Sequence, residues 1–225
     1  MRMSNHVGMY SSQDELTFFD YLSFNNIDTP YDTFTWVDVP VLSPDAKIVV
    51  NINPVVYRSP FGVIAKYGVS GTNYKRGIAI KTDYYNQVNF GALDGLYAPK
   101  VVGNPVPVNS WNEIQAVFND QTVLITVGGV QYTVEGLVQT FVDGGDTWKL
   151  FGGSEQRSGQ MQVAIKDVKF YDLEDNLLSD LVPCVKNPGR YIGMYDQENL
   201  VFYAAYHNGI MQTTKSTILS VGNLT

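Results

Sequence analysis

The sequence predicts an all-β protein made of two packed antiparallel sheets. Two features of composition favour this class: only 16% of the residues are charged, and the chain holds 20 glycines and 15 tyrosines. The third observation is a series of short stretches in which apolar and polar residues alternate, without a convincing helical period. Because each sheet has one apolar face, two sheets packed face to face are the expected arrangement.

The first clear strands are predicted by their alternation. In the stretch KIVVNIN, every second residue from Ile48 is apolar, which is typical of a strand with one buried face. Ile78 and Ile80 repeat the pattern in RGIAIKT. We therefore expect both stretches to contribute to the core.

A three-stranded meander is predicted over residues 111–134. Three alternating runs are separated by Asn119-Asp120 and by Gly128-Gly129. Both dipeptides favour the tight turns that join antiparallel strands. The runs should therefore pair with one another in chain order.

Another strand is expected in MQVAIKDVKFY, and it carries an irregularity. Val163 and Ile165 alternate, but the phase slips by one residue before Val168 and Phe170. Such a slip indicates a β-bulge. The acidic stretch that follows, residues 172–176, is expected to form the next turn.

We expect a single sandwich over residues 18–205, with an N-terminal arm at residues 1–17 and a C-terminal tail or edge strand at residues 206–225. Both end segments are polar with scattered apolar residues. Extended segments of this kind can add to a sheet edge of a neighbouring subunit or fold back onto their own sheet. Both outcomes remain open at this point.

Charge argues against two classes of partner. The net charge of −7 is unfavourable for binding nucleic-acid phosphates or anionic lipid. No apolar run approaches the length of a membrane span, and the first residues lack the apolar core of a secretion signal. If the protein acts outside a cell, one route is release by cell lysis as part of a particle.

The lone Cys184 excludes an internal disulfide and is expected to be a buried small residue.

Three longer stretches resemble a known family. They are YLSFNNIDTPYDTFTWVDVPVLSPDAKIVVNI, WNEIQAVFNDQTVLITVGG, and the run from LFGGSEQ to ENLVFY. They resemble laminin-G-like, concanavalin-A-type jelly-roll domains of bacterial surface proteins and phage proteins. The resemblance covers roughly Tyr21 to Tyr203 and implies a jelly roll of two antiparallel sheets.

The last of these stretches is expected to close the fold. By the resemblance, Pro183 ends a strand and Gly193 allows a tight bend. Tyr195 and Phe202 would anchor the segment to the sheets, with a turn at residues 196–199 between them. Buried rings at those two positions would contribute strongly to stability.

An enzyme with this fold would most resemble a laminarinase-like glucanase. Such an enzyme needs carboxylates on one face of a strand, spaced Glu-x-Asp-x-x-Glu, to act as nucleophile and acid. The acidic clusters of this chain fall in expected turns or in the arm, and the only histidines are His6 and His207. The sequence therefore predicts no catalytic residues and a protein that is not an enzyme.

Glycan binding needs aromatic rings near polar groups on exposed loops, because sugar C–H faces stack on rings. The same rings can also serve in the core or in protein contacts. The aromatic candidates for a glycan site are Trp36, Tyr74, Tyr84, Tyr85, Tyr97 and Trp148.

Calcium is the one candidate cofactor. Some laminin-G-like domains hold Ca²⁺ at the rim through Asp side chains and backbone carbonyls. In FVDGGDTW, Asp143 and Asp146 flank two glycines and could act as ligands, or the stretch could be an ordinary hairpin loop. No other cofactor is expected.

We therefore expect a non-enzymatic structural protein of a bacteriophage virion, in the head, fibre or tail, that displays a lectin-like domain for host-surface or mucosal glycans. Its partners would be other virion proteins or further copies of the chain. The alternative is a carbohydrate-binding module or adhesin, secreted or at the bacterial cell surface, and a glucanase ranks third.

Overall fold

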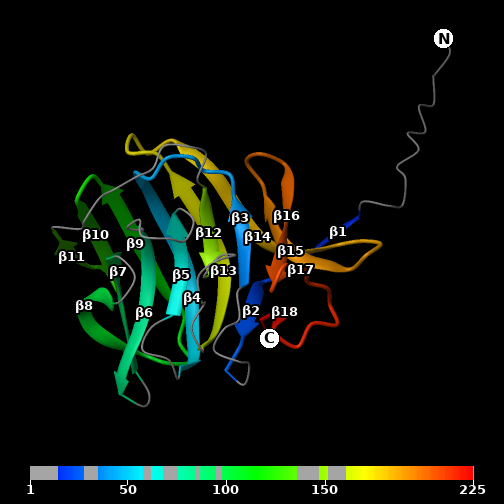
Figure 1. Cartoon of the computed structure of the whole chain (residues 1–225), viewed down its shortest axis with the longest axis horizontal. Helices are drawn as coiled ribbons and strands as arrows, with labels where there is room; N and C mark the ends of the chain where they lie inside the picture. Colours follow the sequence, from blue (N-terminus) through cyan, green and yellow to red (C-terminus); the bar gives the residue numbers. More distant parts are fainter. Residues whose placement is uncertain are drawn as a thin grey trace, which may run out of the picture.

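The computed structural model describes residues 15–27, 35–57, 62–67, 76–84, 87–94, 98–135, 147–151 and 161–224. All regular elements in these ranges are strands, and none is a helix. Figure 1 shows them as a layered β-structure, with β14 to β18 gathered at one end of the molecule. The predicted all-β antiparallel sandwich is confirmed.

One sheet, here called sheet A, contains the predicted meander. Its spatial order is β11 (Val130–Val134), β10 (Thr122–Val127), β9 (Asn112–Asn119), β4 (Ala46–Tyr57) and β13 (Met161–Tyr171), each antiparallel to the next. The two predicted turns are confirmed, because Asp120, Gly128 and Gly129 have φ values of 49°, 57° and 78°.

The strand β13 changes its partner at the predicted bulge. Its first half pairs with β2 (Tyr21–Asn25) and its second half with β14 (Leu177–Lys186), on the side opposite β4. The register with β4 shifts between Ile165 and Val168, so the predicted bulge is confirmed. Beyond it, β18 (Leu219–Gly222) adds to β2, while β1 (Leu16–Phe18) and β15 (Tyr191–Asp196) add to β14.

The second sheet, sheet B, has the order β8 (Ala98–Pro107), β7 (Gln87–Asp94), β6 (Gly77–Tyr84), β5 (Gly62–Tyr67), β12 (Trp148–Phe151), β3 (Thr35–Val39), β16 (Val201–His207) and β17 (Ile210–Met211). The strand β16 belongs to both sheets. Residues 201–204 pair with β15 of sheet A, and residues 205–207 pair with β3 of sheet B.

The core fills the space between the sheets and has Trp148 near its centre. This ring is fully buried, with ring centroids 5.2 Å from Phe118, 5.7 Å from Tyr67 and 5.8 Å from Phe170. Its indole N–H donates to the carbonyl of Ser43 at 2.8 Å, so its one polar group is satisfied.

Cys184 is fully buried in β14, as expected for a small apolar residue. Burial raises the pKa of its thiol to about 12, so the thiol stays protonated at neutral pH.

Two expectations for the closing segment are wrong. Pro183 lies inside β14, opposite Met194, and does not end a strand. Gly193 lies inside β15 rather than at a bend, and a Cβ built there would stand 2.1 Å from the carbonyl oxygen of Tyr203. The glycine therefore permits the close approach of β16. The turn that begins at Asp196 is confirmed.

The end segments contribute strands to the same sheets. β1 begins at Leu16, within the segment expected to be an arm, and residues 1–14 lie outside the described ranges. At the other end, β17 and β18 pair with β16 and β2 of their own chain. Figure 1 shows the C-terminus beside β2 and β18. In the part of the chain that the structure describes, no helix is long and apolar enough to cross a membrane.

Candidate functional site

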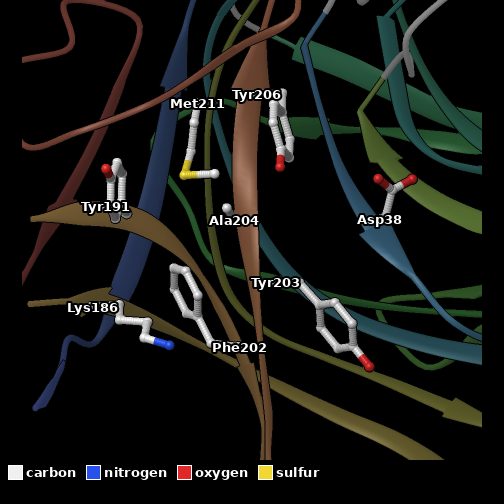
Figure 2. Close-up of a pocket in the computed structure, with 8 residues that line it drawn as sticks. All are labelled: Asp38, Lys186, Tyr191, Phe202, Tyr203, Ala204, Tyr206 and Met211. Atoms are coloured by element: carbon white, nitrogen blue, oxygen red, sulfur yellow. The ribbon is translucent and has the colours of Figure 1, made fainter. Parts of the chain in front are cut away.

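A hollow of about 420 Å³ lies over β16, the strand that joins the two sheets. We call it the aromatic hollow. Figure 2 shows the side chains that line it, which are Asp38, Lys186, Tyr191, Phe202, Tyr203, Ala204, Tyr206 and Met211. They come from five strands, β3, β14, β15, β16 and β17, so the site exists only in the folded chain.

The floor of the hollow follows from the alternation of β16. Phe202, Ala204 and Tyr206 are two residues apart, and side chains at this spacing lie on one face of a strand. The small Ala204 between two large rings leaves room above the strand. Figure 2 shows Tyr191 and Met211 on one side of β16 and Asp38 on the other. The result is an open depression flanked by rings.

Tyr206 is held by a ring stack with Trp36. The two residues are direct cross-strand partners on β16 and β3. Their ring centroids are 5.2 Å apart and the planes differ by 15°. Contact between large rings at paired positions is a stabilising feature of sheets. The Tyr206 ring is therefore positioned before any ligand arrives.

Asp38 is the described acidic residue of the hollow, and two donors orient it. The indole N–H of Trp36 donates to Asp38 Oδ2 at 3.2 Å, and Lys149 Nζ donates to Asp38 Oδ1 at 2.5 Å. Lys149 lies directly opposite Asp38 on β12. The Asp38 side chain nevertheless keeps 48% of its surface exposed. Its carboxylate can therefore accept further hydrogen bonds from a ligand.

His207 follows the hollow on the same strand. Its Nδ1 lies 2.7 Å from the hydroxyl oxygen of Thr35, which is buried on β3. Burial lowers the pKa of His207, so the ring is neutral at neutral pH. The histidine thus supports the junction of β16 with β3 rather than adding charge to the hollow.

Of the rings proposed for a glycan site, Trp36 lies beside the hollow, in the stack with Tyr206. Trp148 is corrected to a core residue, because no part of it reaches solvent where a sugar could stack. The other glycan candidates, and the two calcium candidates, lie outside the part of the chain that the structure describes: Tyr74, Tyr85, Tyr97, Asp143 and Asp146. For Tyr84 the backbone is described, as part of β6, but the side chain is not.

Sequence reasoning missed most of the hollow. Tyr191, Tyr206 and Asp38 were not among the candidates, and Phe202 was expected to be a core anchor. A local signal was present, because Phe202, Ala204 and Tyr206 form a large–small–large pattern on one face of a strand. The contributions of β3 and β14 had no such signal, because they depend on sheet pairing.

Comparison with known proteins supports the fold. No family model matches the chain, and no curated protein matches its sequence. A solved structure of a heptameric SAP-like pentraxin from Limulus polyphemus is 14% identical, with a TM-score of 0.52 over 70% of this chain and 76% of that one. The matches also include an alginate lyase from Alteromonas sp. 272 (10% identity, TM-score 0.36, 66% and 92% covered) and a native glycosidic hydrolase (12%, 0.34, 71% and 95%).

The chain therefore shares a jelly-roll fold of two antiparallel sheets with this pentraxin. The prediction that it is not an enzyme is corrected. The matched structures include a lyase and a hydrolase, and a fold by itself does not decide whether a protein is an enzyme.

Proposed function

We propose that the protein binds carbohydrate in the aromatic hollow. The observation that carries this proposal is the gathering of Tyr191, Phe202, Tyr203 and Tyr206 around one exposed carboxylate, Asp38, in an open depression. Concave sites that combine apolar rings with a few oriented polar groups are typical of ligand binding.

The chemistry of the hollow suits a sugar. Ring faces offer apolar surface to the C–H side of a pyranose, and the Asp38 carboxylate accepts hydrogen bonds from its hydroxyl groups. The ring stack and the ion pair with Lys149 fix both features in advance. A preorganised site loses less conformational freedom when the ligand binds.

A glycan panel tests the proposal. The wild-type protein should bind at least one glycan class, and Tyr191→Ala should weaken that binding about tenfold or more because a rim ring is lost. Tyr191 is 38% exposed, so the fold should tolerate the change. Tyr132→Ala, a half-buried ring on β11 outside the hollow, is the matched control and should bind like the wild type. No bound glycan, or equal weakening in both variants, would contradict the proposal.

The same mixtures should be analysed by mass spectrometry for shortened chains, because the fold is compatible with an enzyme. Cleavage that Asp38→Asn abolishes would place the reaction in the aromatic hollow. Binding without cleavage would leave the binding proposal as it stands.

We further propose that the domain is displayed on a bacteriophage virion, alongside other virion proteins or copies of itself. The support is the resemblance of residues 21–203 to jelly rolls of phage proteins. Mass spectrometry of purified particles tests this placement, and recovery only from a cell-surface or secreted fraction would favour an adhesin or module.

Calcium binding at Asp143 and Asp146 is also a proposal, which titration calorimetry of wild type and Asp143→Asn with Ca²⁺ would test.

A further inference from the structure

A second hollow, of about 380 Å³, adjoins the first. We call it the aliphatic hollow, and it is lined by Pro40, Val41, Leu42, Ser43, Leu178, Asn199 and Tyr203. Tyr203 also lines the aromatic hollow, so the two depressions meet at one ring.

The first wall of the aliphatic hollow is a loop that the core holds in place. Tyr67 donates its hydroxyl hydrogen to the carbonyl of Leu42 at 2.7 Å, and the indole of Trp148 donates to the carbonyl of Ser43 at 2.8 Å. The Leu42 side chain nevertheless stays 64% exposed. An apolar side chain on a fixed backbone beside a hollow is suited to contact a ligand.

The opposite wall offers a hydrogen-bond acceptor. Asn199 Nδ2 donates to the carbonyl of Leu178 and to Asp196 Oδ2, both at 2.8 Å, and this uses both amide hydrogens. Within the described part of the chain, no residue donates to Asn199 Oδ1. The two donor contacts also fix which amide atom is the oxygen. The wall therefore combines aliphatic surface with one oriented acceptor.

We infer that the aliphatic hollow takes the acetamido group of a 2-acetamido sugar, while a neighbouring sugar of the same chain lies on the aromatic hollow. The acetamido N–H donates to Asn199 Oδ1, and its methyl group packs on Leu42 and Leu178. Continuity through Tyr203 is what connects this subsite to the site above. The inference rests on the proposed carbohydrate-binding function and adds the class of sugar.

Titration calorimetry with chitotetraose and cellotetraose tests the inference. Both are neutral, share the same linkage and have the same length, and they differ by an acetamido group in place of a hydroxyl on each sugar. The wild-type protein should bind chitotetraose about tenfold or more tightly than cellotetraose, because the methyl group and the N–H both find partners. A preference below twofold, or no binding of chitotetraose, would overturn the inference, and the glycan panel would still decide the proposed function separately.

Two matched variants locate the preference. Leu42→Asn should reduce the preference for chitotetraose over cellotetraose to below about threefold, because the acetamido methyl group loses its apolar contact. Leu173→Asn makes the same substitution at a leucine that is 46% exposed in the turn after β13 and lines neither hollow, and it should retain the full preference. If Leu42→Asn binds chitotetraose like the wild type, the hollow serves another occupant, such as an apolar peptide side chain, and the inference is wrong.

Discussion

At the scale of single residues, Asp196 organises the turn between β15 and β16. Its side chain is fully buried and accepts hydrogen bonds from the Ser179 hydroxyl at 2.7 Å and from the backbone N–H groups of Asp180, Glu198 and Asn199 at 3.0–3.1 Å. Burial alone would raise the pKa of Asp196, but the hydrogen bonds, led by those from Asn199 and Ser179, lower it below its ordinary value. The folded protein therefore holds this carboxylate ionised at neutral pH.

We expect Asp196→Asn to lower the free energy of unfolding at pH 7 by about 2–4 kcal/mol, because buried donors lose a charged acceptor. A carboxylate with a lowered folded pKa stabilises above its unfolded pKa, and this contribution is lost as pH falls through the folded pKa. The difference from wild type should therefore shrink below about pH 4. Urea unfolding across a pH series measures this change.

Asp175→Asn is the control for the Asp196 variant. The Asp175 side chain is 70% exposed and bonds Lys47 at 2.8 Å, so its loss should cost under about 1 kcal/mol. Equal costs for the two variants, or an Asp196→Asn cost that is the same at pH 7 and pH 3, would contradict the assigned role.

Residue size proved a poor guide to burial in the closing segment. Tyr195 and Phe202 were expected to be the anchors, but both are only half-buried, and Tyr195 makes an edge contact with Phe18 at 5.7 Å. The buried large apolar side chains of β15 are those of Ile192 and Met194. The sequence could not show this, because both faces of β15 carry large apolar residues and only the packed partner decides which face is inside.

At the scale of elements, the spacing of β15 and β16 depends on Gly193. A Cβ at this position would lie 2.1 Å from the backbone oxygen of Tyr203, which cannot move without shifting β16. We expect Gly193→Ala to cost roughly 1–3 kcal/mol and to weaken glycan binding, because β16 forms the floor of the aromatic hollow. Thermal unfolding and glycan titration measure the two effects.

Gly222→Ala provides the matched comparison. A Cβ there would meet the Tyr21 hydroxyl at 2.4 Å, the far end of a side chain that can rotate away. This variant should be the milder of the two and should leave glycan binding unchanged. A Gly193→Ala protein as stable as Gly222→Ala would show that β16 adjusts without cost.

Regular alternation and local turns made several elements predictable. The meander of β9 to β11 and the bulge in β13 follow from neighbouring residues alone. β12 shows where this reasoning ends. Lys149 points outward, so alternation predicts that Phe151, two residues later, lies on the same outer face. Phe151 is instead fully buried, and its ring stacks on Phe24 with ring centroids 4.7 Å apart. The backbone of Phe151 has a φ of 62°. A packing contact across the sandwich overrides the local pattern there.

At the scale of the whole molecule, the candidate site is a product of topology. Asp38 lies early in the chain, while the other lining residues fall between Lys186 and Met211. They meet because β16 leaves β15 and joins β3. The fold class could be predicted because every strand contributes to the composition and to the alternating pattern of the sequence. The site could not, because it depends on one pairing between distant segments.

The same long-range pairing brings the C-terminal segment back onto its own sheet. Leu219 of β18 lies opposite Phe24 of β2 and is 1% exposed, whereas Leu224 is 48% exposed. We expect Leu219→Ser to lower Tm by about 5–15 °C, since a large buried side chain is lost in a chain of this size. Leu224→Ser, the same change a few residues later, should shift Tm by less than about 2 °C.

Scanning calorimetry combined with light scattering distinguishes this arrangement from contact between subunits. If β18 pairs within its own chain, Leu219→Ser lowers Tm equally at low and high protein concentration, and the molar mass does not change. If the segment instead joins a neighbouring chain, the variant keeps the wild-type Tm of the single chain and loses the larger assembly. Leu219 is buried and lies opposite Phe24 of its own chain, which favours the first outcome. Loss of this side chain from the core should lower the stability of the single chain at any protein concentration.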